Sequence, residues 1–221
     1  MFDNRATRNK FSRRSRIAGS AACVAAALIT VSIGTQSATA SADTRALAAP
    51  GLGSAALVQS EDFFQQGLSP VGATVDLAGK QALSACSGEE TMLVLTKGKA
   101  SGYADVTWTF DTSASLLTEA AADGSTAKSA ISYENQLNAL LRGCQHEPAG
   151  HWHYGAGHAL TVTGGEGHWY PSYSGDGVVS GGVAVIRSGT RVGIVELVGQ
   201  PTDDPGYMQG ITAAAINRLA S

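Results

Sequence analysis

The sequence predicts an α+β domain with a mostly antiparallel sheet and helices packed on one face of that sheet. Residues 103–110 alternate apolar and polar side chains, which is typical of a strand with one buried face. Residues 127–144 place apolar side chains at the spacing of an amphipathic helix. Residues 177–187 and 191–199 are two β-rich runs joined by Ser188-Gly189-Thr190, which favours a hairpin. We therefore expect one domain of this class, over residues 55–221.

The first 40 residues have the organisation of a signal peptide. Six basic residues precede an uncharged apolar run at 17–33, and Ala38-Thr39-Ala40 supplies the small-x-small pattern that signal peptidase cleaves. The apolar run is shorter and more polar than a membrane span, and Cys23 is poorly placed for lipid attachment. We expect a secreted, extracellular protein without a stable membrane anchor. Both the general secretory route and the twin-arginine route stay open, because Arg13-Arg14 is followed by a third arginine, Arg16.

Charge and cysteine content narrow the class of function. Cleavage after Ala40 would remove six of the 15 Lys and Arg but only one of the 18 Asp and Glu, which leaves an acidic domain. Such a domain is a poor match for nucleic acid or an anionic membrane surface. Two cysteines remain, Cys86 and Cys144, and in an oxidising compartment we expect them to form one disulfide. A catalytic thiol at Cys144, two residues before His146, is the alternative.

The domain is expected to begin with a helix. Residues 41–54 are rich in Ala, Gly and Ser and are interpreted as a flexible leader. Ser60 is the expected N-cap of the helix, and two acids follow it in the first turn, where the helix dipole favours them. Phe63 and Phe64 supply its buried side, and Gly67 ends it.

Two strands and a second helix are expected next. The apolar run 91–96 and the alternating run 103–110 are predicted to pair as a hairpin. Trp108 lies on the apolar side of the alternation and is predicted to be buried. Residues 112–122 are rich in Ala and Leu and are predicted to be helical.

The C-terminal half is expected to contain the long helix, three strands and a last helix. The apolar stripe of helix 127–144 includes Cys144, which can therefore reach Cys86 through the core. Residues 152–163 are predicted to form a strand that precedes the hairpin. A helix at 205–220 ends the chain. Trp169 lies beside glycines and a proline and is predicted to be at least half exposed.

Several short motifs carry a resemblance to a known family. They are Leu57-Val58-Gln59-Ser60-Glu61-Asp62-Phe63, Val106-Thr107-Trp108, the segment 183–197, and the positions of the two cysteines. Together they resemble the extracellular sensor domain of PknH-type actinobacterial serine/threonine kinases, which also occurs as stand-alone secreted proteins. The resemblance implies a non-catalytic sensor or ligand-binding module, with a groove between the sheet and the helices. Members of the family often have two disulfides, whereas only one is possible here.

All five histidines of the chain lie between residues 146 and 168, and two of its three tryptophans and three of its six tyrosines lie among them or directly after them. Aromatic rings give a large contact area, and nearby glycines allow close approach of a ligand. The expected surface for a small molecule or an envelope or protein partner consists of Trp152, Tyr154, Trp169, Tyr170 and Tyr173. The alternative is a metal-binding protein that holds Zn or Cu through His151, His153, His158 and His168. No cofactor is expected if the first interpretation holds.

A secreted hydrolase is the second alternative. The sequence contains no G-x-S-x-G elbow between a strand and a helix, and no glycine-rich phosphate loop before a helix. A pair of carboxylates for glycoside hydrolysis cannot be chosen without geometry. We therefore expect a protein that is not an enzyme.

Overall fold

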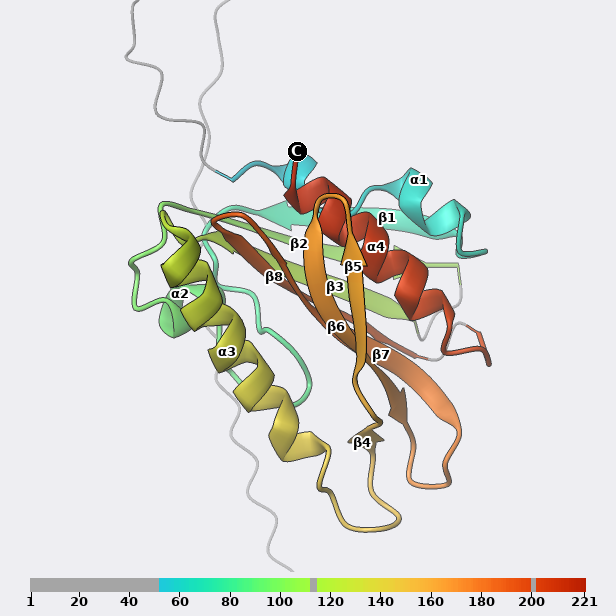
Figure 1. Cartoon of the computed structure of the whole chain (residues 1–221). Helices are drawn as coiled ribbons and strands as arrows, with labels where there is room; N and C mark the ends of the chain where they lie inside the picture. Colours follow the sequence, from blue (N-terminus) through green and yellow to red (C-terminus); the bar gives the residue numbers. More distant parts are fainter. Residues whose placement is uncertain (1–51, 112–114, 200–201) are drawn as a thin grey trace, which may run out of the picture. The chain divides into compact units, whose positions relative to one another are not determined.

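The structure is a computed structural model that describes residues 52–111, 115–199 and 202–221 (Figure 1). The predicted signal peptide and most of the predicted leader lie outside these residues. Leu52, which the sequence assigned to the leader, is already buried in the core. The elements in chain order are η1 (Ser54–Ala56), α1 (Ser60–Phe64), β1 (Pro70–Asp76), α2 (Met92–Leu95), β2 (Gly102–Phe110), β3 (Leu116–Asp123), α3 (Ala127–Cys144), β4 (His153–Tyr154), β5 (His158–Val162), β6 (Gly165–Tyr173), β7 (Val179–Ser188), β8 (Arg191–Val198) and α4 (Tyr207–Leu219).

The strands in the described part of the chain form one eight-stranded sheet. Its order is β1-β2-β3-β8-β7-β6-β4, and β5 also pairs with β6. Every pairing is antiparallel. The sheet is open, so β1 forms one edge. The predicted α+β class with an antiparallel sheet is confirmed.

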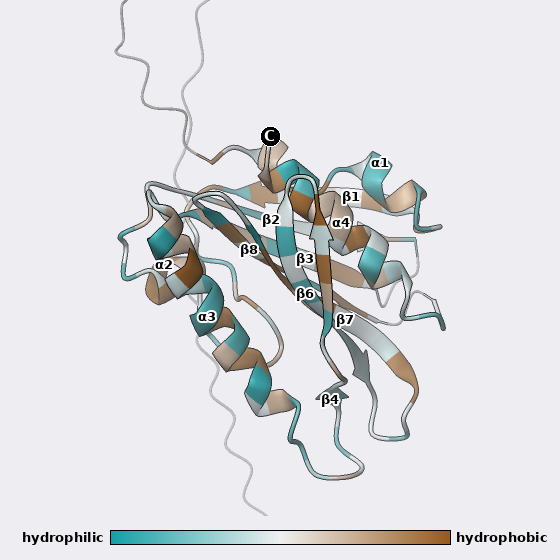
Figure 2. Ribbon diagram, in the orientation of Figure 1, coloured by the Kyte–Doolittle hydropathy of each residue, from teal (hydrophilic) through white to brown (hydrophobic). Residues whose placement is uncertain are grey.

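The helices cover both faces of the sheet, whereas the sequence led us to expect one covered face. On β7, Ala184 and Ile186 belong to the core cluster that contains α4. Their neighbours Val183 and Val185 belong to the cluster that contains α3. Both long helices alternate between hydrophilic and hydrophobic residues (Figure 2). Helices cover both faces because β7 and β8 are apolar on both sides, a pattern typical of strands buried between two layers.

Residues 91–96 were predicted to be a strand, and this prediction is wrong. They form the short helix α2, in which the Thr91 hydroxyl caps the N-terminus by accepting from the Val94 N–H at 3.3 Å. The predicted hairpin is therefore also wrong, since β2 pairs with β1 and β3. A short apolar run has no clear period, so periodicity alone does not separate a strand from a buried helix.

Residues 112–122 were predicted to be helical, but the described part of this range belongs to β3. This strand lies inside the sheet, between β2 and β8. Its small residues Ala120, Ala121 and Ala122 are all buried, and they point alternately to the two faces. Alanine favours helix in isolation, but here the packing of both sheet faces outweighs that preference.

Strand β6 was missed, because its sequence contains glycines and a proline that are typical of turns. The structure explains the glycines by close packing. A Cβ atom at Gly165 would lie 2.2 Å from the backbone oxygen of Arg187 on the neighbouring strand. Trp169 in this strand is 7% exposed, so the prediction of an exposed side chain is wrong. Trp108 is only partly buried and packs against the α4-side core.

The expected strand 152–163 is instead two strands, β4 and β5, which both pair with β6. The other expected elements are present with shifted ends. Helix α1 begins at Ser60 but takes Gln59 as its N-cap, and Phe64 is 62% exposed rather than buried. The last helix starts at Tyr207, after an Asp204 carboxylate that accepts from the Gly206 N–H at 2.8 Å. Helix α3 and strands β7 and β8 lie where the sequence predicts them.

Candidate functional site

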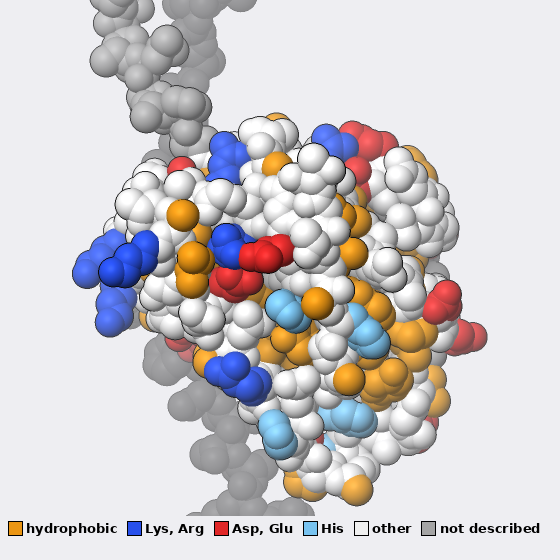
Figure 3. All heavy atoms as spheres, viewed as in Figure 1, with side chains coloured by type: hydrophobic (Ala, Val, Ile, Leu, Met, Phe, Trp, Pro, Cys, Tyr) orange, Lys and Arg blue, Asp and Glu red, His pale blue; other side chains and the backbone are white. Residues whose placement is uncertain are grey.

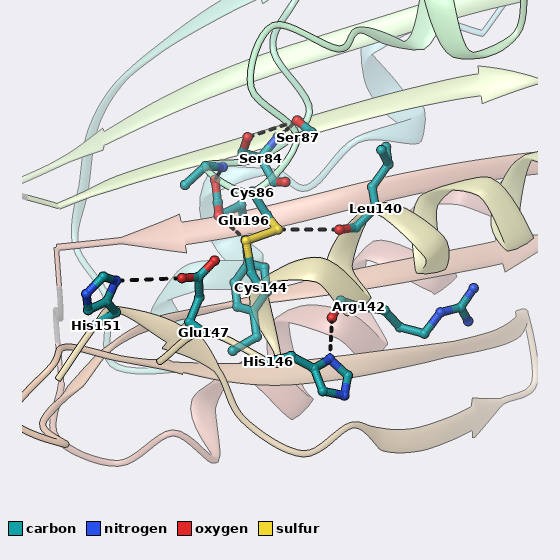
Figure 4. The surroundings of a disulfide bond; sticks show 12 residues. Ser84, Cys86, Ser87, Leu140, Arg142, Cys144, His146, Glu147, His151 and Glu196 are labelled. Atoms are coloured by element: carbon teal, nitrogen blue, oxygen red, sulfur yellow. Dashed lines mark hydrogen bonds and ion pairs between the residues drawn. A yellow bond between two sulfur atoms is a disulfide. The ribbon is translucent and has the colours of Figure 1, made fainter. Parts of the chain in front are cut away.

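The two cysteines are joined at the C-terminal end of α3 (Figure 4). Cys86 and Cys144 form a disulfide with their Cα atoms 6.0 Å apart, which confirms the predicted bridge. Neither sulfur is therefore a free thiol. The neighbouring His146 directs Nδ1 at the backbone oxygen of Arg142, at 2.8 Å. The alternative of a catalytic thiol at Cys144 is not supported by this arrangement.

A buried carboxyl group from β8 fixes the segment around the disulfide. Glu196 accepts from the Tyr154 hydroxyl at 2.5 Å and from the Ala85 N–H at 2.8 Å. Burial raises the pKa of the Glu196 carboxyl, and burial together with the charge of Glu196 raises the pKa of Tyr154. Tyr154 is thus a structural residue that ties β4 to β8 through the core.

The five aromatic residues of the expected binding surface do not lie on one surface. Tyr154 and Trp169 are buried, in core clusters on opposite faces of the sheet. Trp152 and Tyr170 pack against the α3-side core, and Tyr173 is partly exposed beside β4. Successive side chains of a strand point to opposite faces, so neighbouring aromatics in the sequence are separated in space. Tyr154 and Trp169 could reach a ligand only after rearrangement.

The histidines are spread from the end of α3 to β6, and Figure 3 shows histidines at separate points on this face. His151 lies 3.7 Å from the Glu147 carboxylate. His153 and His158 stack on aromatic rings of β6, with centroids 5.6 and 4.3 Å apart. Within residues 52–111, 115–199 and 202–221, no group of three or more His, Cys, Asp or Glu is placed to hold a metal ion. Binding of Zn or Cu stays a prediction for titration.

A hollow of about 290 Å³ lies between α3 and β6, and we call it the α3–β6 hollow. Its position follows from two local periodicities. The lining residues of α3 recur every three or four positions, which places them on one side of the helix, and those of β6 are two apart, which places them on one face of the strand. The lining residues are Asn135, Asn138, Arg142, Gln145, His168 and Tyr170.

The lining of the α3–β6 hollow is rich in hydrogen-bond donors and contains no carboxylate. The Tyr170 hydroxyl donates to Asn138 Oδ1 at 3.2 Å, which leaves the amide NH₂ of Asn138 as a donor. The Gln145 side chain donates to the Gly155 backbone oxygen at 2.9 Å. Burial is the main cause that raises the pKa of Tyr170. This hollow can therefore bind a polar ligand that supplies acceptor atoms.

Sequence reasoning found two of the six lining residues, His168 and Tyr170. It missed the three on α3 and its C-cap Gln145, because they are polar residues of a helix with an exposed side. A signal was present, since Asn135, Asn138 and Arg142 form a polar stripe beside the apolar stripe of the same helix. The sequence did not indicate which segment lies against this polar stripe, because β6 itself was not predicted.

Two other hollows differ from this one in their charge. One of about 550 Å³ lies between α1 and α4, and its Arg218 is bonded to Asp62. The other, of about 280 Å³, lies at the β5–β6 turn, and its Arg187 is bonded to Glu134 and Glu166. In both cases the arginine is already neutralised by acids of the domain.

The chain resembles a solved extracellular domain in fold. The sequence matches no protein-family model and no curated protein. None of the described helices is long and apolar enough to cross a membrane. The structure is similar to the crystal structure of the extracellular domain of PknH from Mycobacterium tuberculosis, with a TM-score of 0.51 and 12% sequence identity. The likeness covers 75% of this chain and 93% of that chain, and the two therefore share a fold.

Proposed function

We propose that the protein is a secreted, non-catalytic, sensor-like domain that binds a small molecule in the α3–β6 hollow. The observation that carries the proposal is the hollow itself, in which the Asn138 NH₂ and the Arg142 guanidinium are donors and no carboxylate contributes to the lining. The shared fold with an extracellular domain supports an extracellular role. The expected export signal at 1–40 points the same way.

The buried acids of the domain have structural rather than catalytic surroundings. Glu119 is fully buried and accepts from the Val58 N–H at 2.7 Å. Glu196 is buried and held by Tyr154 and the Ala85 N–H. A substrate cannot reach either carboxyl group without opening the core. This favours a binding function over a hydrolase.

A binding screen tests the proposal. The purified domain is heated with a panel of neutral sugars, amino acids, carboxylic acids and phosphate esters, and its Tm is measured. We expect at least one compound to raise the Tm, because a ligand that binds only the folded state stabilises it. The variant Asn135→Trp fills the hollow and should lose that shift. Gln136→Trp places the same ring on another, exposed side of α3 and should keep it. A panel without any binder, or binders that are insensitive to Asn135→Trp, would reject the proposal.

A further inference from the structure

We infer that the ligand of the α3–β6 hollow carries a carboxylate, and that the Arg142 guanidinium binds it. This inference rests on the proposed function, and it names the chemical class of the ligand. It starts from a comparison of the arginines in the described residues. Arg187 and Arg218 each bond two carboxylates. Arg191 donates to backbone oxygens of Leu219 and Ser221.

Arg142 is different from these three. In residues 52–111, 115–199 and 202–221, its guanidinium has no hydrogen-bond or ion-pair partner. In Figure 4 it extends away from every other labelled side chain. An always-charged, solvent-exposed group with several fixed donors thus lines a hollow to which no carboxylate contributes.

The rest of the lining suits an anion. No Asp or Glu contributes to the hollow, and the only other ionisable groups are His168 and Tyr170. A planar guanidinium presents two parallel N–H groups that match the two oxygens of a carboxylate. The amide of Asn135 and the NH₂ of Asn138 can donate to the same ligand. Arg142 gives this hollow a positive charge, whereas the domain as a whole is acidic.

The volume of the hollow and the residues that line it limit the size and chemistry of the rest of the ligand. A volume of about 290 Å³ lies near the lower end of the range for small-molecule sites. The half-buried ring of Tyr170 gives the lining one aromatic wall. A small organic acid with a flat or apolar body therefore fits both the charge and the wall.

An acid and its amide test the inference directly. Benzoate and benzamide have the same shape and differ in charge. Their Kd values are measured by NMR titration of the ¹⁵N-labelled domain, with the amide signals around Gln145 and His168 as the reporters. We expect benzoate to bind about tenfold more tightly than benzamide, because only benzoate forms the charge-assisted pair. Phenyl phosphate is the third probe, because a guanidinium pairs with phosphate as well as with carboxylate, and its Kd shows which of the two anions the hollow prefers.

Two variants of equal charge complete the experiment. Arg142→Gln should abolish the preference for benzoate, whereas Lys128→Gln, on the exposed first turn of the same helix, should leave it unchanged. Arg142→Gln removes no contact that the fold uses, so it should keep the Tm of the parent. Equal binding of acid and amide in the hollow, or tighter binding of phenyl phosphate, would overturn the carboxylate but keep the proposed function. If the three probes and the earlier panel all leave the hollow unaffected, both fail.

Discussion

At the scale of single residues, the most unusual group is the carboxyl of Glu119. It is fully buried in β3, and one oxygen accepts from the Val58 N–H while the other has no partner. Burial, with a smaller contribution from the charge of Asp62, raises its pKa from 4.5 to about 8. The Trp108 indole donates to the Val58 oxygen at 3.3 Å. These two contacts fix the segment between η1 and α1 on the sheet.

We expect the stability of the domain to fall as pH rises because of this group. Its pKa is higher in the folded than in the unfolded chain, so its contribution is fully present below pH 4.5 and is lost as pH rises through about 8. Glu119→Gln keeps an oxygen acceptor for Val58 but cannot ionise. Relative to the parent, this variant should gain about 2–4 kcal/mol in unfolding free energy between pH 5 and pH 8.5. Urea unfolding at the two pH values measures the gain.

The matched control is Glu89→Gln, which changes an exposed acid. It should follow the pH dependence of the parent. Asp105, whose pKa burial raises from 3.8 to about 6, acts in the same direction at lower pH and is unchanged in both variants. Parallel curves for the parent and Glu119→Gln would show that Glu119 does not titrate in this range.

At the scale of elements, β6 determines the site, and its glycines allow it to pack. Gly165 cannot accept a Cβ atom without moving the backbone of β7. Gly143, near the end of α3, has open space around its Cα. The two glycines therefore have different roles.

This difference predicts opposite effects of the same substitution. Gly165→Ala should lower the unfolding free energy by about 1–3 kcal/mol, the range for overpacking in a tight site. Gly143→Ala should raise it by about 0.5–1 kcal/mol, because alanine is the better helix former. Chemical denaturation of the two variants compares them. Equal effects would show that close packing is not the reason for Gly165.

The aromatic residues show how an element decides a site. The sequence grouped Trp169 with Tyr170 and Tyr173 because they are neighbours in the chain. In the strand, Trp169 turns into the α4-side core and Tyr170 turns toward α3. Only Tyr170 of the five predicted aromatics lines the α3–β6 hollow. Of the predicted aromatic surface, only Tyr170 thus belongs to the candidate site, together with polar residues of α3.

At the scale of the whole molecule, the open prediction is export. If residues 1–40 are a signal peptide, the secreted protein should begin near Ser41 or Asp43 and contain no free thiol. Expression of the full chain, with residues 1–40 included, in an actinobacterial host tests both statements. The intact mass of the protein is then measured in the culture medium. The mass should correspond to loss of residues 1–40 or 1–42. A retained N-terminus would contradict the signal peptide, and two alkylatable thiols in the unreduced, unfolded protein would contradict the bridge.

The sequence by itself was enough to predict the α+β class, the Cys86–Cys144 bridge, helix α3 and the β7–β8 hairpin. The class, the helix and the hairpin each depend on a pattern within one segment. The bridge depends on the cysteine count, which leaves Cys86 and Cys144 as the only possible pair after cleavage of the predicted signal peptide. The tertiary structure decided that residues 92–95 are helical, that β3 is a strand, and that helices cover both faces. It also brought Arg142 and His168 to the same hollow. These features depend on which distant segments pack together, and a short apolar or polar run carries no information about its partner in space.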